Sequence, residues 1–294
     1  MNEKKMPKYV GGQAVIEGVM MKGIHTVVAV KRPDGKVQIK KLNEFSFGFL
    51  EKIPFIRGFF VLLKAMIIGM GALTYSANVS DEEEITKKDM IISILLAILF
   101  SVGGFGLAPM YLTKLFNINN EFWFSFAEGV IRAIFVILYI WVISLFKDVK
   151  RVFEYHGAEH KAVYTYENKE QLIVENAKKY TTLHPRCGTS FLIITVFASI
   201  IVFSITGAMG YTTLLEKTIT RIVLLPLVAG VAYEFQRFTA KIIDTSLGKI
   251  LASPGLMLQK ITTSEPDEEQ LKVALISLEY ALKEDFDGEE VVEI

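Results

Sequence analysis

The motif HGAEH, at positions 156–160, has the residue types and the spacing of a metal site. In a helix, His156 and His160 lie four positions apart on one face, so both rings can reach one ion. Glu159 gives the motif the form H-x-x-E-H, the inverse of a zinc-protease signature. There the glutamate takes a proton from a water whose pKa the metal lowers to about 7. We therefore expect Zn²⁺, or another divalent metal, on the two histidines and a catalytic role for Glu159.

A second segment, HPRCGTSF at 184–191, adds two more ligand types. His184 and Cys187 form an H-x-x-C pair, and Cys187 is the one cysteine of the chain. With His156 and His160 they would form a closed structural zinc site, whereas three ligands would leave a position for water. Without a metal, the same residues would be hydrogen-bonded histidines and a small core cysteine. Arg186 would hold an oxyanion or a lipid headgroup, or serve as a cation at the membrane interface.

Other polar residues are weaker candidates. Glu234 is a possible further ligand, with an ion pair to Arg237 as its alternative, and Asp244 is a more distant version of the same idea. Glu17 is either a carboxylate on an edge strand or part of a site. His25 is interpreted as a surface histidine.

Four segments are apolar and long enough to position this site at a membrane, since a span needs about 20 residues. The chain is 51% hydrophobic, and glycines with Pro109 in the first segment favour close packing or a kink. Glu128 and Arg132, in the second segment, are spaced to form an ion pair. The four segments are 90–113, 127–146, 189–210 and 221–236.

A fifth apolar stretch, 55–77, carries Arg57 and Lys64 on one helical stripe, which is typical of a helix lying in the interface. Basic residues concentrate in 1–54 and in 147–188, so the positive-inside rule places both segments in the cytoplasm. Four spans satisfy this, and five would export one basic region. We therefore expect a multi-pass cell-membrane protein with both termini cytoplasmic.

The expected fold is an α-helical polytopic membrane protein with about four transmembrane helices, an interfacial helix and a small N-terminal cytoplasmic β region. A PDG turn between two alternating runs predicts a hairpin within 9–47. The tail, from SEPDEEQ onward, has the capping residues and period of a helix, which we expect to pack on the β region. The predicted regions are 1–54 (β-rich), 55–77 (interfacial), 78–89 (charged linker), 90–146 (spans one and two), 147–188 (cytoplasmic loop with the metal site), 189–236 (spans three and four) and 237–294 (cytoplasmic).

Four sequence blocks together resemble the YqhQ-like family of bacterial membrane proteins. They are GGQAVIEGVMM, EYHGAEHKAVYTYE, HPRCGTSF and ASPGLMLQKITTSEPDEEQ, and the resemblance covers nearly the whole chain. The family is a domain of unknown function described as predicted metal-dependent enzymes. The resemblance implies a metal for His156, Glu159, His160, His184 and Cys187, and it marks Glu17 as part of a family block.

Two functions follow from these residues. The first is a zinc-dependent hydrolase at the cytoplasmic face of the bilayer, acting on a peptide, an amide or a lipid-linked group. The second is a non-enzymatic membrane protein with a structural His/Cys zinc site. A transporter has less support, because the spans carry few charges and show no repeated halves. A formal net charge of zero gives no reason to expect a nucleic-acid partner.

Overall fold

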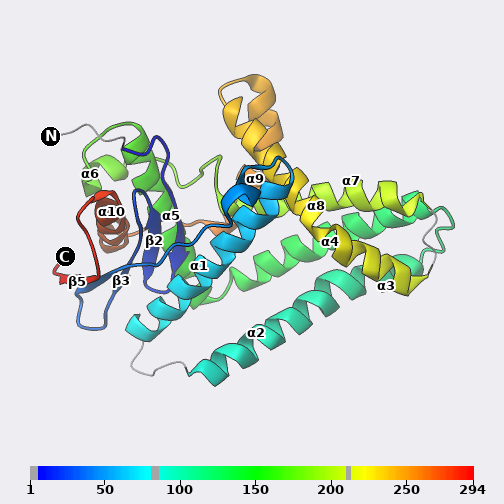
Figure 1. Cartoon of the computed structure of the whole chain (residues 1–294), viewed down its shortest axis with the longest axis horizontal. Helices are drawn as coiled ribbons and strands as arrows, with labels where there is room; N and C mark the ends of the chain where they lie inside the picture. The colour runs from blue at the N-terminus through cyan, green and yellow to red at the C-terminus, as the bar shows by residue number, and fades with distance from the viewer. Residues whose placement is uncertain (1–5, 81–85, 210–212) are drawn as a thin grey trace.

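A computed structural model describes residues 6–80, 86–209 and 213–294, and in it a sheet unit stands at one end of a group of long helices (Figure 1). The predicted charged linker, 78–89, lies partly outside the described residues. The helices are α1 (Ile56–Ser80), α2 (Lys87–Ser101), α3 (Ala108–Lys114), α4 (Glu121–Ile143), α5 (Lys147–Glu167), α6 (Val174–Ala177), α7 (Gly188–Gly207), α8 (Leu214–Lys241), α9 (Ser246–Thr262) and α10 (Glu268–Leu282), with a 3-10 helix η1 (Gly48–Lys52) and a π-helical turn η2 (Val102–Leu107).

The sheet has five antiparallel strands in the order β1-β2-β3-β4-β5. The predicted N-terminal β region is confirmed, and the PDG turn closes the β3–β4 hairpin, with Gly35 at φ +83°. The fifth strand comes from the C-terminus and was not predicted. The strands are β1 (Gly11–Val15), β2 (Gly18–Lys22), β3 (Thr26–Lys31), β4 (Val37–Lys41) and β5 (Glu289–Val292).

Both faces of this sheet are covered by helices. Alternate residues of a strand point to opposite faces, so Val19 and Val27 pack against α5 and α10 while Val15 and Val28 pack against α1. Ser277 of α10 also donates from Oγ to the Val19 carbonyl at 2.8 Å. The prediction that the tail helix packs on the β region is therefore confirmed, and N-terminal strands and C-terminal elements belong to one unit (Figure 1).

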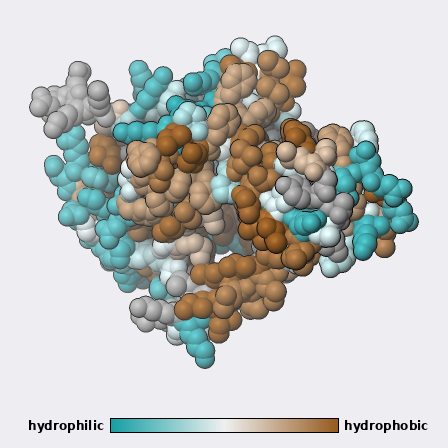
Figure 2. Space-filling model, turned by 45° about the vertical axis from the view of Figure 1, so that its right-hand side comes forward, coloured by the Kyte–Doolittle hydropathy of each residue, from teal (hydrophilic) through white to brown (hydrophobic). Residues whose placement is uncertain are grey.

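Among the described residues, five helices are long and apolar enough to cross a membrane. The four predicted segments correspond to α2–α3, α4, α7 and α8, but α8 is longer than expected and contains Pro226 within it. The predicted interfacial stretch forms α1, which also satisfies the length and composition of a span. Figure 2 shows hydrophobic surface gathered over the helical part of the molecule. The five helices are Ile56–Ser80, Ile91–Lys114, Glu121–Ile143, Gly188–Gly207 and Leu215–Lys241.

The two cations of α1 are held by carboxylates of the protein. Arg57 donates twice to Glu234 of α8, both at 2.6 Å, and Lys64 lies 3.5 Å from Glu51. Near the same end Gly230 contacts the Phe55 carbonyl so closely that a Cβ would lie 1.9 Å from the oxygen. The start of α1 is thus fixed to α8, and its second half lies on the sheet.

A buried ion cluster joins α4 to α8. The Glu128 side chain is 1% exposed and accepts hydrogen bonds from Arg132 and from Arg221. The predicted Glu128–Arg132 pair is confirmed. Arg221 is a second partner of Glu128 and was not predicted, because it lies far from Glu128 in the sequence. Arg132 also donates to the Phe105 carbonyl at 2.9 Å, in η2. The cluster therefore connects the glycine-rich turn to both helices.

Replacing Glu128 by Gln should destabilise the helices, because two buried guanidinium groups would lose their counter-charge. A loss of about 3–5 kcal/mol is expected for breaking a buried ion pair. Thermal unfolding in detergent micelles measures the effect. Glu121→Gln is the matched control: Glu121 lies 2.7 Å from Lys217 and its side chain is 25% exposed, so its loss should be smaller. Equal losses in the two variants would contradict this interpretation.

Candidate metal centre

Helix α5 carries the HGAEH motif on the face that packs into the sheet unit. His156, Glu159 and His160 are all buried, although each is polar. Tyr155 and Ala158 of the same helix lie in the apolar core shared with α10 and the sheet. Burial of polar rings requires partners, so the surroundings of the two histidines decide what they do.

The structure brings three candidate ligands together. One ligand atom from each of His156, His160 and Cys187 lies within 4.8 Å of the other two. The Nε2 atom of His156 is 3.0 Å from Cys187 Sγ. Cys187 is the N-cap residue of α7, where Sγ accepts from the Thr189 backbone N–H at 3.3 Å. The sulfur therefore reaches the histidines from the start of the next long helix, as the sequence suggested.

Both histidines direct Nδ1 to a main-chain carbonyl. Nδ1–H of His156 donates to the Thr262 carbonyl at 2.8 Å, and Nδ1–H of His160 donates to the Thr182 carbonyl. Their Nε2 lone pairs are thereby directed to the cysteine, and Nε2 of His160 is buried without a hydrogen-bond partner among the described residues. Metal-bound histidines usually donate their second N–H in this way. Two nitrogens and one sulfur at this separation fit Zn²⁺.

Glu159 lies beside this group. Its Oε2 atom is 4.0 Å from His156 Nε2. Burial raises the pKa of Glu159, against the opposing effects of His156, His184 and the backbone N–H of Gly12. Gly12, in β1, has no side chain to displace the carboxylate: a Cβ there would be 3.0 Å from Glu159 Cγ. The first strand thus belongs to the surroundings of the candidate base.

His184 lies next to the three ligands but outside that group. Its ring centroid is 5.5 Å from that of His160, and its Nε2 is 3.7 Å from Glu167 Oε2. Its Nδ1 accepts the Arg186 backbone N–H at 3.3 Å. Burial lowers the pKa of His184, which keeps the ring neutral. Ligation by His184 stays a prediction.

Gln259 of α9 is a positioning residue that the sequence did not reveal. It is fully buried; its Oε1 accepts the His184 N–H at 2.7 Å, and its Nε2 donates to the His184 carbonyl at 2.8 Å. The last residue of the same helix, Thr262, supplies the carbonyl for His156. A lone glutamine on the apolar face of ASPGLMLQKIT was the available signal. The role of a main-chain carbonyl, such as that of Thr262, cannot be predicted from the sequence, because every residue has one.

The weaker candidates lie outside the three-ligand group. Glu17, with φ +51° in the β1–β2 turn, accepts two hydrogen bonds from Arg151 and so fixes the start of α5. Glu234, for which the sequence left a ligand role and a pair with Arg237 open, pairs with Arg57 of α1. Asp244 is exposed between α8 and α9.

The two remaining predicted polar residues, His25 and Arg186, are half-buried and lie outside the three-ligand group. Nε2 of His25 is 3.1 Å from the Glu284 carbonyl. Arg186 pairs with Glu167 and lies over the Tyr9 ring, 4.4 Å from its centroid, so its charge is already partnered.

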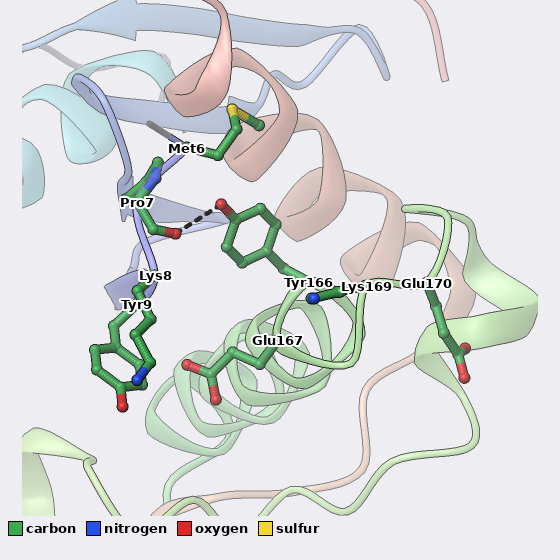
Figure 3. A pocket seen from close by; sticks show the side chains of 8 residues that line it. All are labelled: Met6, Pro7, Lys8, Tyr9, Tyr166, Glu167, Lys169 and Glu170. Atoms are coloured by element: carbon green, nitrogen blue, oxygen red, sulfur yellow. Dashed lines mark hydrogen bonds between the residues drawn. The ribbon is translucent and has the colours of Figure 1, made fainter. Parts of the chain in front are cut away.

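A pocket of about 670 Å³ opens beside Glu167. Figure 3 shows it between the N-terminal segment and the end of α5, where the Tyr166 hydroxyl donates to the Pro7 carbonyl at 2.8 Å. Because Glu167 also contacts His184, the pocket borders the surroundings of the metal centre. Its lining residues are Met6, Pro7, Lys8, Tyr9, Tyr166, Glu167, Lys169 and Glu170.

Comparison with known proteins identifies the family. A family model described as "Protein of unknown function (DUF1385)" matches residues 53–284, which include every ligand named above. The chain belongs to the DUF1385 family. This DUF1385 chain is 34% identical, over 308 aligned residues, to the uncharacterized protein YqhQ of Bacillus subtilis (strain 168), covering 96% of this chain and 95% of that one. The YqhQ-like resemblance is thus confirmed. No solved structure matches the chain.

The glycine of HGAEH is predicted to be essential for the site. A Cβ on Gly157 would lie 2.1 Å from the Ser264 carbonyl, in the segment that holds His156. Gly157→Ala should therefore cost at least about 1–3 kcal/mol, although alanine usually favours a helix. Gly188→Ala, with open space around it, is the control and should be close to neutral. Thermal unfolding and metal content are measured for both; similar behaviour would contradict the prediction.

The metal-free protein should lose stability in mild acid. Burial lowers the pKa values of His160 and His184 below 6.5, so the unfolded chain binds protons that the folded chain does not. The contribution of the two neutral histidines to the free energy of unfolding is complete above pH 6.5 and is lost as the pH falls below that value. The raised pKa of Glu159 changes the free energy of unfolding with pH in the opposite direction.

His184→Gln tests this by removing one of the two groups. After chelation, its unfolding free energy should fall less than that of the wild type between pH 6.5 and about pH 5, by up to about 1.4 kcal/mol per pH unit. Denaturant titrations across that range provide the measurement, and identical slopes would refute the assignment.

Proposed function

We propose that this protein is a membrane-anchored zinc-dependent hydrolase, with His156, His160 and Cys187 as ligands and Glu159 as general base. The observation that carries the proposal is the convergence of two histidine Nε2 atoms and one sulfur, with a buried carboxylate beside them. Three protein ligands with an open position are typical of catalytic zinc, whereas structural zinc has four.

Each residue of the site has a separate role in the proposed hydrolysis. Glu159, with its raised pKa, takes a proton from the attacking water and delivers it to the leaving nitrogen or oxygen as the acyl bond breaks. Zinc at this position supplies Lewis-acid activation of water and of the substrate carbonyl. The carbonyls of Thr182 and Thr262 keep His160 and His156 in the tautomer that presents Nε2. Water supplies OH to the acyl carbon and H to the leaving group.

The proposal places the site at the cytoplasmic face of the cell membrane, with the lipid bilayer as the partner of the helices. The basic segments 1–54 and 147–188 supply β1–β4 and α5, and the positive-inside rule favours the cytoplasm for both segments. We propose four spans and an interfacial α1. Ala72, with Ile68 and Tyr75, packs on the sheet, so the second half of α1 is not surrounded by lipid.

A structural zinc site is the second candidate function. The group is buried, and it joins α5, the N-terminus of α7 and the C-terminal end of α9, as a structural ion would. His184, beside His160, is a ready fourth ligand for such a closed site. In that case the metal would fasten the sheet unit to the helices.

Metal analysis and two variants separate these functions. Purified protein should contain one Zn²⁺ per chain, and cobalt replacing it should show a sulfur-to-metal charge-transfer band. His156→Ala should lose the metal. Glu159→Gln should keep the metal, the cobalt spectrum and the melting temperature, but lose turnover of fluorogenic peptide, amide and ester substrates by roughly a hundredfold or more.

The outcomes are distinct. A protein without stoichiometric zinc contradicts both functions. Zinc in four-ligand coordination with no turnover, and with lower stability in His184→Ala, supports the structural site and overturns the hydrolase.

A further inference from the structure

Helix α9 has an apolar face that no other described element covers. Leu247, Ile250 and Met257 are 57%, 67% and 66% exposed. Their spacings of three and seven residues place them on one stripe of the helix, together with the half-buried Pro254. Another side of α9 is buried against the neighbouring helices, through Gly248, Ala252, Gly255, Leu258, Gln259 and Thr262. The stripe therefore faces away from the protein.

Cations border this stripe, and no acid lies on the helix. Lys249 and Lys260 are both exposed and lie about three turns apart, so they share one flank of the stripe. Neither forms an ion pair within the part of the chain that the structure describes. The flanking acids are Asp244, in the turn before α9, and Glu265, which pairs with Lys161. An apolar stripe with lysines along its border is typical of a helix in the plane of a membrane interface.

The position of α9 agrees with such an interface. Leu258 packs against Ile140, in the last turn of α4, and against Ile193, in the second turn of α7. At 1.5 Å per residue, α9 thus crosses α7 about 7–8 Å from the start of that helix. Interfacial helices lie about 5–10 Å deep in the boundary between headgroups and acyl chains. In Figure 1 the hairpin of α8 and α9 projects at the top of the molecule, and in Figure 2 hydrophobic surface lies just below its tip.

The buried side of α9 contacts the candidate metal centre. Gln259 holds the peptide of His184, and the Thr262 carbonyl accepts from His156. Gly255 packs so closely on the first turn of α7 that a Cβ there would lie 2.6 Å from Ser190. One helix therefore carries the exposed stripe on one side and part of the surroundings of the centre on the other.

We propose that the exposed stripe of α9, with Lys249 and Lys260, is a binding surface for anionic phospholipids of the cytoplasmic leaflet. Leu247, Ile250 and Met257 enter the upper acyl region, and the two lysines reach the phosphates. This surface holds the metal centre at the level of the headgroups. The proposal uses the membrane placement proposed above, and it depends neither on the hydrolase nor on zinc.

Photo-crosslinking in nanodiscs tests the contact with lipid. The amino acid p-benzoylphenylalanine replaces Ile250 in the full-length protein or, as controls, Val223 of α8 (68% exposed) or Val291 of β5 (45% exposed). The discs contain equal amounts of phosphatidylcholine and phosphatidylglycerol, and mass spectrometry identifies the adducts. Lipid adducts at positions 250 and 223 should be at least roughly tenfold more abundant than at position 291.

Each outcome decides a separate point. Lipid adducts at position 223 but not at 250, or equal adducts at 250 and 291, refute the proposal and leave the spans standing. Absence of lipid adducts at all three positions overturns the membrane placement and this proposal with it. Crosslinking of position 250 to a second copy of the chain, in place of lipid, also refutes the proposal.

The headgroup of the adduct tests the role of the lysines. At position 250, phosphatidylglycerol adducts should outnumber phosphatidylcholine adducts, whereas the ratio at position 223, in the middle of a span, should follow the composition of the bilayer. Replacing both Lys249 and Lys260 by Gln should lower the ratio at position 250 by up to roughly fivefold for each lysine.

A second double variant is the matched control. Lys169→Gln with Lys272→Gln makes the same change of charge at two exposed lysines of the sheet unit, and it should leave the ratio at position 250 unchanged. No preference for phosphatidylglycerol in the chain that keeps all four lysines, an unchanged ratio without Lys249 and Lys260, or equal falls in the two double variants overturns the proposal.

Discussion

Two hydrogen bonds from imidazole rings to main-chain carbonyls are the constraint on which the centre depends. Thr262 fixes the tautomer of His156, and Thr182 fixes that of His160. A side chain at Gly157 would collide with the Ser264 carbonyl and crowd the Thr182 side chain, so it would displace the two segments that supply these carbonyls. Gln259 then ties the peptide of His184 to α9. The ligands are thus oriented by backbone that comes from outside their own helix.

Much of the candidate site was predictable, because local spacing carries its information. Positions 156 and 160 fall on one face of any helix. The single cysteine directly precedes an apolar segment, so it was expected at the end of a long helix. The group of His156, His160 and Cys187 needed no tertiary knowledge. The contributions of Thr182, Gln259 and Gly12 did, since a carbonyl or a glycine has the same appearance in every sequence.

The fold, like the site, was predictable where the sequence carries local signals and not where tertiary contacts decide the structure. The N-terminal hairpin and the tail helix have local signals, a PDG turn and capping residues, and both are confirmed. β5 has four residues with two acids, and only pairing with β4 makes it a strand. The partners of charged residues were the least predictable feature. Glu234 lies three positions from Arg237, yet it pairs with Arg57, because helix packing rather than sequence distance brings charges together.

The completion of the sheet by β5 has a consequence for biosynthesis. Helix α10 and β5 are synthesised after the other described elements, yet α10 shares the cover of one face of the sheet with α5, and β5 covers one edge. All the long apolar helices are synthesised before that happens. Until α10 and β5 are synthesised, the N-terminal strands therefore have only α5 on that face, and the edge of β4 is unpaired. A chain cut short before α10 would retain every metal ligand but lack the core that supports α5.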